Sequence, residues 1–229
     1  MSEQSIQPAV GEVDFGSLRR LEPISRQFGF DRGRCIDRYY IEGFLERHSA
    51  DIRGRVLEVA ENTYTRRFGG RRVTQSEILH VEPGAKRATI IADLTREGVL
   101  CADSFDCIIL TQTLPFIYDV HAAVRSLARI LRPGGVVLAT FAGISQISRY
   151  DCDRWGDYWR FTSMSARRLF EEAFPAGNVQ VESHGNVLAA VGFLHGLAAE
   201  DMKREELDYH DRDYELIITV RAVKPGEEA

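Results

Sequence analysis

The most informative side chains in this sequence are three carboxylates at or near the ends of successive predicted strands. Glu58 lies within an apolar run, Glu82 follows the second strand and Asp93 follows the third. In a doubly wound sheet, ligands bind beyond the carboxyl ends of the strands. Glu82 follows Glu58 by 24 residues, close to the spacing of about 20 residues at which an acid binds ribose hydroxyls in dinucleotide folds. The three acids therefore indicate a nucleotide-like ligand, although such acids also cap helices or pair with arginines.

The segment that follows the first strand predicts the loop of that site. In Arg55–Thr65 a short buried strand precedes a turn, and Asn62 can cap a helix. A strand, a tight turn and a helix N-terminus form a common cradle for such ligands. A glycine-rich loop would place glycine where this chain has Ala60, Asn62 and Tyr64. Asn tolerates left-handed φ better than most residues, so Asn62 is a plausible substitute, and Tyr64 could close over the ligand.

The segment 150–160, after the fifth predicted strand, is rich in aromatic and acidic residues and should overhang the ligand. Candidate general bases are Asp151, Asp153 and, after the fourth strand, His121. The candidate substrate residues offer flat apolar faces or a cation, and they are Tyr150, Trp155, Trp159 and Arg160. The alternatives are a loop that packs its own aromatics and a surface histidine at a helix start. Neither a metal-ligand cluster nor a Ser-His-Asp spacing is present in the sequence.

The elements that must position these residues alternate between strand and helix. The predicted strands cover 55–57, 77–81, 88–92, 105–111, 136–140, 179–183 and 215–223. The predicted helices cover 35–48, 120–131, 164–174 and 187–206, with a further short helix within 16–34. Near-continuous apolar strands that alternate with helices predict an α/β protein with a mainly parallel, doubly wound sheet. We expect an N-terminal helical extension over 1–50 and one Rossmann-like domain over 51–229.

Composition narrows the class of protein. The chain has 229 residues, 44% hydrophobic and 28% charged, with a net charge of −5, which is ordinary for a globular protein and gives no reason to expect a nucleic-acid partner. The four cysteines form no C-x-x-C pair, which favours reduced thiols in the cytoplasm. No apolar run reaches the length of a membrane span.

At this point the sequence resembles the Rossmann-like, class I S-adenosylmethionine-dependent methyltransferases. The resemblance runs from about Gly54 to Thr140 in five ordered motifs. The motifs are Val56–Ala60, Glu82 after the second strand, Ala92-Asp93-Leu94, Ser104–Gln112, and Arg129–Leu138 with its Pro-Gly-Gly turn. The resemblance implies a seven-stranded sheet whose last strand is antiparallel, with S-adenosyl-L-methionine as cofactor. The flanks 36–42 and 159–162 resemble bacterial methyltransferases associated with polysaccharide biosynthesis.

The resemblance also implies residue roles. Glu82 would hold the ribose and Asp93 would reach the adenine amino group. On the helix before the first strand, one of Tyr39 and Tyr40 would line the methionine end while the other packs, and Arg38 could meet the cofactor carboxylate. The full set of expected cofactor-binding residues is Tyr39, Glu58, Ala60, Asn62, Tyr64, Glu82, Asp93, Leu94, Thr111 and Gln112.

These observations leave several functions open. The first is methyl transfer to a small molecule or saccharide, most simply at a hydroxyl. The second is a degenerate methyltransferase-like binding module without transfer activity, which the absent glycines favour. A nucleotide-dependent enzyme such as an NAD enzyme is a third, against which the lack of G-x-G-x-x-G argues. The apolar segment Val187–Ala199 could be buried in the domain, which we prefer, or in a dimer interface, and the oligomeric state stays open.

Overall fold

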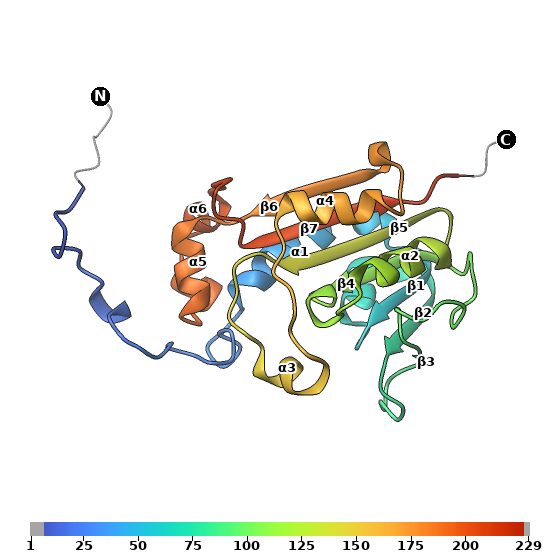
Figure 1. The fold of residues 1–229 in the computed structure, drawn as a ribbon, viewed down its shortest axis with the longest axis horizontal. Helices are drawn as coiled ribbons and strands as arrows, with labels where there is room; N and C mark the ends of the chain where they lie inside the picture. The colour runs from blue at the N-terminus through green and yellow to red at the C-terminus, as the bar shows by residue number, and fades with distance from the viewer. Residues whose placement is uncertain (1–6, 227–229) are drawn as a thin grey trace.

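A computed structural model describes residues 7–226 and contains one seven-stranded sheet. The strands are β1 (Gly54–Val59), β2 (Val73–His80), β3 (Ile90–Ile91), β4 (Phe105–Thr111), β5 (Leu131–Ala142), β6 (Val179–His184) and β7 (Ile217–Val223). Their order across the sheet is β3-β2-β1-β4-β5-β7-β6 (Figure 1). All neighbouring pairs are parallel except those of β7, which is antiparallel to both β5 and β6. The predicted seven-stranded Rossmann-like sheet with an antiparallel last strand is confirmed.

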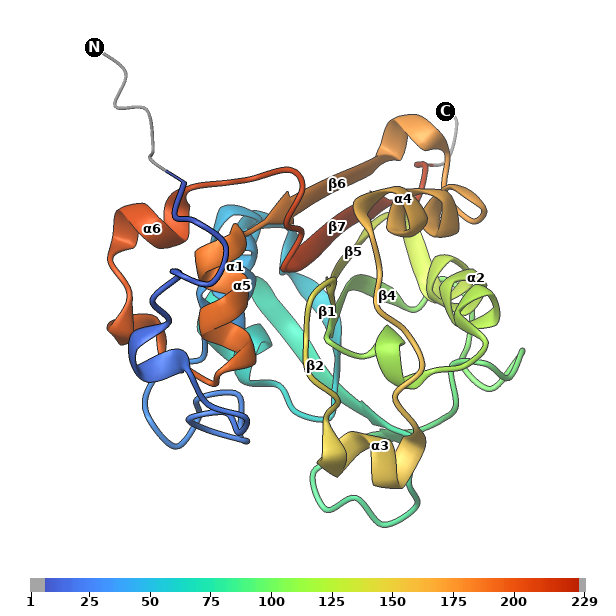
Figure 2. The same ribbon diagram turned by 60° about the vertical axis from the view of Figure 1, so that its left-hand side comes forward.

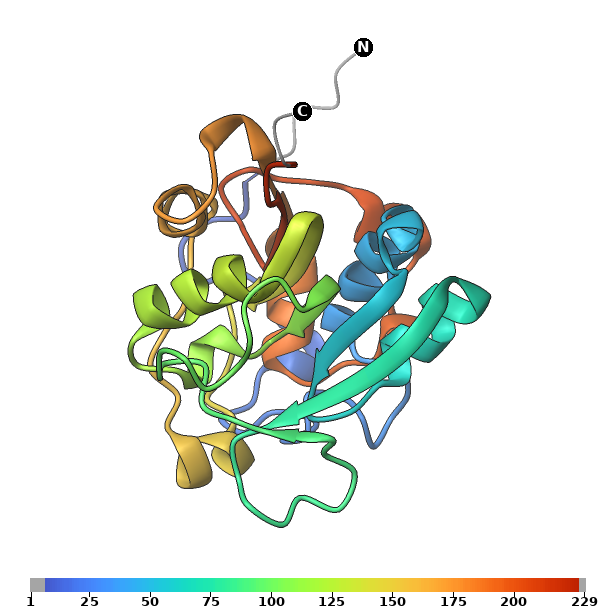
Figure 3. The ribbon, with the colours of Figure 1, turned by 90° about the vertical axis from the view of Figure 1, so that its right-hand side faces the viewer.

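Helices cover both faces of this sheet. They are α1 (Ile36–Arg47), α2 (Val120–Ile130), α3 (Arg149–Trp155), α4 (Ser163–Glu171), α5 (Val187–Leu194) and α6 (Arg204–Asp208). Side chains of α2 and α4 share one core cluster with the sheet, and side chains of α1 and α5 share the other. Figure 3 shows the green α2 and the blue α1 on opposite sides of the sheet.

The strand β4 shows why its sequence is apolar without interruption. Ile108 and Leu110 point into the α2 and α4 cluster, whereas Cys107 and Ile109 point into the α1 and α5 cluster. All four side chains have no exposed surface. A central parallel strand buries both of its faces, so the usual alternation of polar and apolar residues is absent.

The Pro-Gly-Gly turn lies where α2 ends and β5 begins. Leu131 pairs with Phe105 and Val136 pairs with Cys107, so the residues between Leu131 and Val136 form an irregularity in the ladder. Gly134 has φ of +77°, a conformation that glycine adopts without steric cost. This turn sends the chain from the helix directly into the centre of the sheet.

Two helical predictions are wrong. The segment 16–34 forms no α-helix and contains only a single 3₁₀ turn, Gly16–Leu18. The segment 187–206 is not continuous, because α5 ends at Leu194 and α6 begins at Arg204. Gly196, at φ +69°, produces the break. The N–H of Leu197 bonds to the carbonyl of Gly192 and that of Gly196 to Phe193, the Schellman pattern that ends a helix.

The N-terminal part of the chain contributes to the core through α1. Ile36, Ile41, Phe44 and Leu45 are buried and belong to the α1 and α5 cluster. Residues 1–6 of the predicted extension lie outside the described residues, and the predicted boundary at residue 50 stays a prediction. Within 7–226 we find no helix with the length and apolar character needed to cross a membrane.

The end of β6 holds a histidine whose protonation should govern acid stability. The ring of His184 stacks on Tyr40 at 5.8 Å between centroids, and Nε2 lies 3.1 Å from Oγ1 of Thr219. Burial, with a smaller effect of Arg47, lowers the pKa of His184 to about 4. A histidine in the unfolded chain has a pKa of about 6.5, so acidification between these values protonates the unfolded state first and favours it.

We therefore expect the free energy of unfolding to fall by about 2 kcal/mol between pH 7.5 and pH 5 through this one residue. Urea unfolding of the wild type and of His184→Gln at both pH values measures the contribution as the difference in pH dependence. An equal loss of stability in the two proteins would show that His184 is not responsible.

Candidate functional site

The end of β1 is joined to the following helical turn by the carboxylate of Glu58. Glu58 is 2% exposed. Its Oε1 accepts the backbone N–H of Tyr64 at 3.1 Å, and its Oε2 accepts the N–H and the hydroxyl of Thr65 at 2.7 and 2.6 Å. Burial raises the pKa of Glu58, and the bonds from Thr65 and Tyr64 oppose that rise. Because both oxygens are used inside the protein, Glu58 contributes to the site by fixing its loop.

Ala60 takes the conformation that the sequence pattern reserves for glycine. Its φ is +69°, and its N–H donates to the carbonyl of Leu79 in β2 at 2.9 Å. Left-handed backbone costs a non-glycine residue roughly 1 kcal/mol or more. Substitution of the glycine has therefore left the turn itself in place.

Asn62 and Tyr64 have different places in this loop. The amide of Asn62 donates to Oγ of Ser76 at 3.0 Å, so Asn62 fastens the loop to β2. Asn62 is absent from the residues with positive φ, so Ala60 alone of the three glycine positions has the left-handed backbone. Tyr64 is buried and stacks on Phe68 at 6.0 Å. Burial raises the pKa of Tyr64 to about 12, although the nearby Arg38 lowers it.

The other two strand-end acids lie on the same edge of the sheet. In Asp93, Oδ1 accepts both the N–H and the hydroxyl of Thr95 at 2.8 Å, and Oδ2 is 3.8 Å from Nε of Arg96. Glu82 follows β2, and its Oε1 accepts the indole N–H of Trp155 at 3.1 Å. This bond joins the loop after β2 to α3, which lie side by side in Figure 2.

A cavity of about 1110 Å³ opens at this edge. That volume is at the upper end of the range for small-molecule and cofactor sites. Ten of the predicted site residues line it: Glu58, Ala60, Tyr64, Asp93, Leu94, Thr111, Gln112, Asp151, Trp155 and Arg160. The cavity thus extends from the loops after β1 and β3 to the segment after β5.

The cavity wall contains buried polar atoms that lack partners among the described residues. They are Oδ1 of Asp37, Nη1 of Arg38 and Nε2 of Gln112. Asp37 and Arg38 are adjacent at the start of α1, with Oδ2 and Nη1 3.9 Å apart. Burial raises the pKa of Asp37 and Arg38 opposes this; burial also disfavours the charged form of Arg38, yet the adjacent carboxylate raises its pKa. Unsatisfied buried groups are costly, so this wall is suited to a ligand that offers both a cation and an anion.

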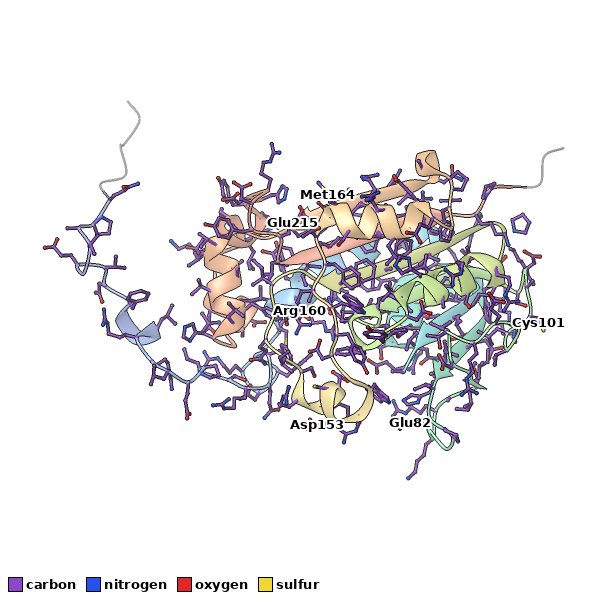
Figure 4. All side chains as sticks on the ribbon, in the orientation of Figure 1. Glu82, Cys101, Asp153, Arg160, Met164 and Glu215 are labelled. Carbon is purple, nitrogen blue, oxygen red and sulfur yellow. The ribbon has the colours of Figure 1, made fainter. Side chains whose placement is uncertain are left out.

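The segment after β5 is held in place by one ion pair. Both terminal nitrogens of Arg160 bond to the carboxylate of Asp157, at 2.5 and 3.0 Å, and the side chain of Asp157 is 1% exposed. Arg160 also donates to the carbonyls of Ser145 and Gln146. Its donors are therefore used in shaping the loop, although the side chain lines the cavity. Figure 4 shows Arg160 inward of α3 and Asp153 at the outer edge.

Seven predicted site residues lie outside the cavity lining: Tyr39, Asn62, Glu82, His121, Tyr150, Asp153 and Trp159. His121 lies 2.6 Å from Glu172 on the surface, and Asp153 is exposed and 3.9 Å from Arg149. The hydroxyl of Tyr39 donates to Asp208 at 2.5 Å. Trp159 donates its indole N–H to the carbonyls of Ile117 and Tyr118. The geometry of the cavity therefore gives no support to His121 or Asp153 as a base.

Several cavity residues were not among the sequence predictions. Asp37, His80, Tyr118 and Ser148 line the cavity, and Ser148 donates its hydroxyl to Asp151 at 2.6 Å. For Asp37 a signal exists, since a carboxylate beside Ile36 on the apolar face of a helix needs a partner. His80 is the last residue of β2, whereas the positions of Tyr118 and Ser148 depend on loop conformation, which the sequence pattern does not determine.

Residues 50–139 match the family model described as a methyltransferase domain. This range contains β1 to β4, α2 and most of β5, together with the loops that carry Ala60, Asp93 and Gln112. No curated protein matches the sequence.

Solved structures with a similar fold include three that cover most of this chain. The [4+2]-cyclase SpnF is 16% identical with a TM-score of 0.55, over 85% of each chain. A SAM-dependent methyltransferase from Archaeoglobus fulgidus is 10% identical with a TM-score of 0.54, over 82% of this chain and 94% of its own. An S-adenosylmethionine-dependent methyltransferase from Mesorhizobium loti is 15% identical with a TM-score of 0.53, over 82% and 98%. At these identities the likeness shows the fold alone.

The matched domain, the strand order and the cavity at the carboxyl ends of the strands point to one conclusion. Residues 50–139 match a methyltransferase domain, and the protein is a transferase whose cofactor is S-adenosyl-L-methionine.

Proposed function

We propose that this protein methylates a hydroxyl group of a small molecule or saccharide. The observation that carries the proposal is the single cavity, which is lined both by Asp93 and Ala60 at the cofactor end and by Asp151 and Trp155 after β5. A donor and an acceptor can therefore lie in one cavity, and the main task of the protein in such a reaction is to orient them and exclude water.

The residues of the cavity suit S-adenosylmethionine. We assign the adenine end to Asp93 and Leu94, where Oδ2 of Asp93 can accept from an amino group. Glu82 does not line the cavity itself but is bonded through Oε1 to Trp155, which does, and we assign its free Oε2 to the ribose. The unpartnered atoms of Asp37 and Arg38 fit the ammonium and carboxylate of the methionine end.

The charge of the cavity supports the same placement. Eight carboxylates and four arginines line it, so its wall has an excess of negative charge. Such a wall favours a ligand with a sulfonium and an ammonium group, and it disfavours an acceptor that carries a dianionic phosphate. We therefore expect a neutral, hydroxylated acceptor.

For the reaction itself, the bound cofactor supplies an electrophilic methyl group on sulfur. We assign Asp151 the role of general base, because it lines the cavity and Ser148 holds its Oδ2 at 2.6 Å. A base within reach of the acceptor hydroxyl removes its proton as the oxygen attacks. The rings of Trp155, Tyr118 and Tyr158 line the same part of the cavity and give apolar surfaces of the kind on which sugar rings stack.

A degenerate binding module without transfer activity is the second candidate. It is favoured by the left-handed Ala60 in place of glycine and by the bond from Trp155 to Glu82, which uses one of the oxygens assigned to the ribose. The two candidates differ in turnover, so activity decides between them.

The setting of the reaction is also a proposal. An association with polysaccharide biosynthesis follows from the resemblance of the segments 36–42 and 159–162. The four cysteines Cys35, Cys101, Cys107 and Cys152 are all free, which supports a reducing compartment such as the cytoplasm.

Calorimetry should detect binding of S-adenosylmethionine and of its demethylated product, S-adenosylhomocysteine, and no binding of NAD. We expect both sulfur nucleosides to bind, because each has the ammonium and carboxylate groups that the unpartnered atoms of Asp37 and Arg38 fit. Absence of binding for both nucleosides would contradict the proposed function and its degenerate alternative together.

The assignment of the adenine end is tested by Asp93→Asn. Loss of the charged acceptor should weaken S-adenosylhomocysteine binding about tenfold, which corresponds to about 1.4 kcal/mol. Asp153→Asn is the matched control, because this carboxylate is exposed and lies outside the cavity. Equal affinities for the two variants in calorimetry would show that adenine lies elsewhere.

The loop is tested by Ala60→Gly. Glycine removes the cost of left-handed backbone but loses more entropy on folding, so we expect the thermal midpoint to rise by up to about 3 °C. The control Ala128→Gly in α2 should lower it, since glycine within a helix costs about 1 kcal/mol. A thermal midpoint lowered by Ala60→Gly as much as by Ala128→Gly would show that the left-handed backbone of Ala60 carries no strain.

The base is tested by Asp151→Asn, with transfer of labelled methyl from S-adenosylmethionine to a panel of neutral saccharides. We expect kcat to fall about 100-fold or more with unchanged cofactor affinity in calorimetry. Unchanged kcat would exclude Asp151 as the base, and wild-type protein that binds cofactor but labels no hydroxylated acceptor would favour the binding module.

A further inference from the structure

The helix α5 has an apolar face that no other described element covers. Val187, Leu188, Val191 and Leu194 are 37 to 50% exposed. Their spacing places them along one side of the helix, whereas Ala189 and Phe193 are buried against the sheet. A row of exposed large apolar side chains on a surface helix is typical of an interaction site. We call these four residues the α5 face.

The N-terminal arm, residues 7–23, has a complementary character. Val10, Val13, Phe15 and Leu21 are exposed large apolar side chains. The polar and cation–π contacts that the structure gives the arm join residues no more than four positions apart in the chain. Figures 1 and 2 show the arm, in dark blue, running along the side of the body without joining the sheet. Its apolar side chains therefore have no partner layer in a single copy.

The arm leaves the body at the end of the α5 face. The N–H groups of Ile24 and Ser25 donate to the carbonyl of His195, the residue after α5, at 2.8 and 3.1 Å. Gly29 packs so closely on Leu197 that an added Cβ would lie 2.6 Å from its carbonyl oxygen. The root of the arm is thus fixed next to α5, while the rest of the arm stands apart from α5 in Figure 1.

The areas of the α5 face and of the arm limit which partner can cover them. A helix of eight residues is about 12 Å long, and the α5 face alone is too small for a stable interface, which needs about 800 Å² from each partner. The arm adds a second apolar surface beside the first. A second copy of this chain offers both an arm and an α5 face, so each copy can cover the other, as a two-fold axis requires.

We propose that this protein is a homodimer in which the arm of each copy packs on the α5 face of the other. The two surfaces are reciprocal and lie on the opposite side of α5 from the sheet. The dimer leaves the cavity of each copy open, because neither the arm nor the α5 face lines it.

Sedimentation of the full chain tests the dimer. We expect a dimer at micromolar concentration, and we expect Val191→Asp in the α5 face and Phe15→Asp in the arm each to raise the dimer dissociation constant at least tenfold. Both side chains are exposed, so circular dichroism should show a folded chain. Val99→Asp is the matched control, since Val99 is 47% exposed in the loop before β4 and should leave the dimer intact. A monomeric wild type, or a dimer that resists either substitution, overturns the proposal.

Photo-crosslinking identifies the occupant of the α5 face. With benzoylphenylalanine in place of Phe15, we expect a product of twice the chain mass whose linked peptide contains residues 187–194. The same peptide in a product of single-chain mass would show that the arm folds back on its own α5, and would overturn the exchange. A dimer-mass product linked to any other peptide also overturns it.

Discussion

The hydrogen bonds of Glu58 are the constraint on which the site depends. A carboxylate that is buried near the end of a central strand needs hydrogen-bond donors within the protein. It finds them in the N–H groups of Tyr64 and Thr65 and in the Thr65 hydroxyl. These bonds close the chain into a tight turn, and that closure holds Ala60 at positive φ despite its side chain. The loop survives the loss of glycine because its shape is set by the carboxylate.

Sequence pattern was sufficient to place the strands, whereas the seven-stranded sheet with an antiparallel last strand was implied by the family resemblance. The strands β1 to β7 were each expected near their observed positions, because a buried parallel strand has an apolar run that few other structures need. The pattern did not predict the end of α5, which a single glycine determines. The apolar run that begins at Val187 continues beyond His195, and Gly196 within it ends α5 through its left-handed conformation. Helix-period apolar residues within 16–34 also predicted a helix, but in the structure Leu21 is fully exposed and Phe28 has a positive φ that a helix does not allow.

The residues of the candidate site also fall into a predictable and an unpredictable group. Asp93, Leu94, Thr111 and Gln112 were predictable, because residues just after parallel strands must gather at one edge of the sheet. Contacts between segments distant in the chain were not predictable. The hydrogen bond from Trp155 to Glu82 and the ion pair between Arg160 and Asp157 both depend on the path of the loop after β5. Asp37 and Arg38 face the cavity because of the rotation of α1 about its own axis. Sequence periodicity predicts that rotation only to within one or two residues.

The fold alone does not determine the reaction, since a [4+2]-cyclase is among the structures that share it. Support for S-adenosylmethionine as the ligand comes from groups that the fold does not require. A Rossmann-like sheet needs neither an unpartnered carboxylate oxygen nor an unpartnered guanidinium nitrogen at the start of α1, and each lowers stability while it stays unpaired. The adjacent unsatisfied atoms of Asp37 and Arg38 suit a ligand with an ammonium and a carboxylate side by side, as in our proposed placement of the methionine end of the cofactor. Within the protein, the 3.9 Å ion pair between the two side chains and the position of the Arg38 guanidinium over the Phe30 ring offset only part of the cost of burying them.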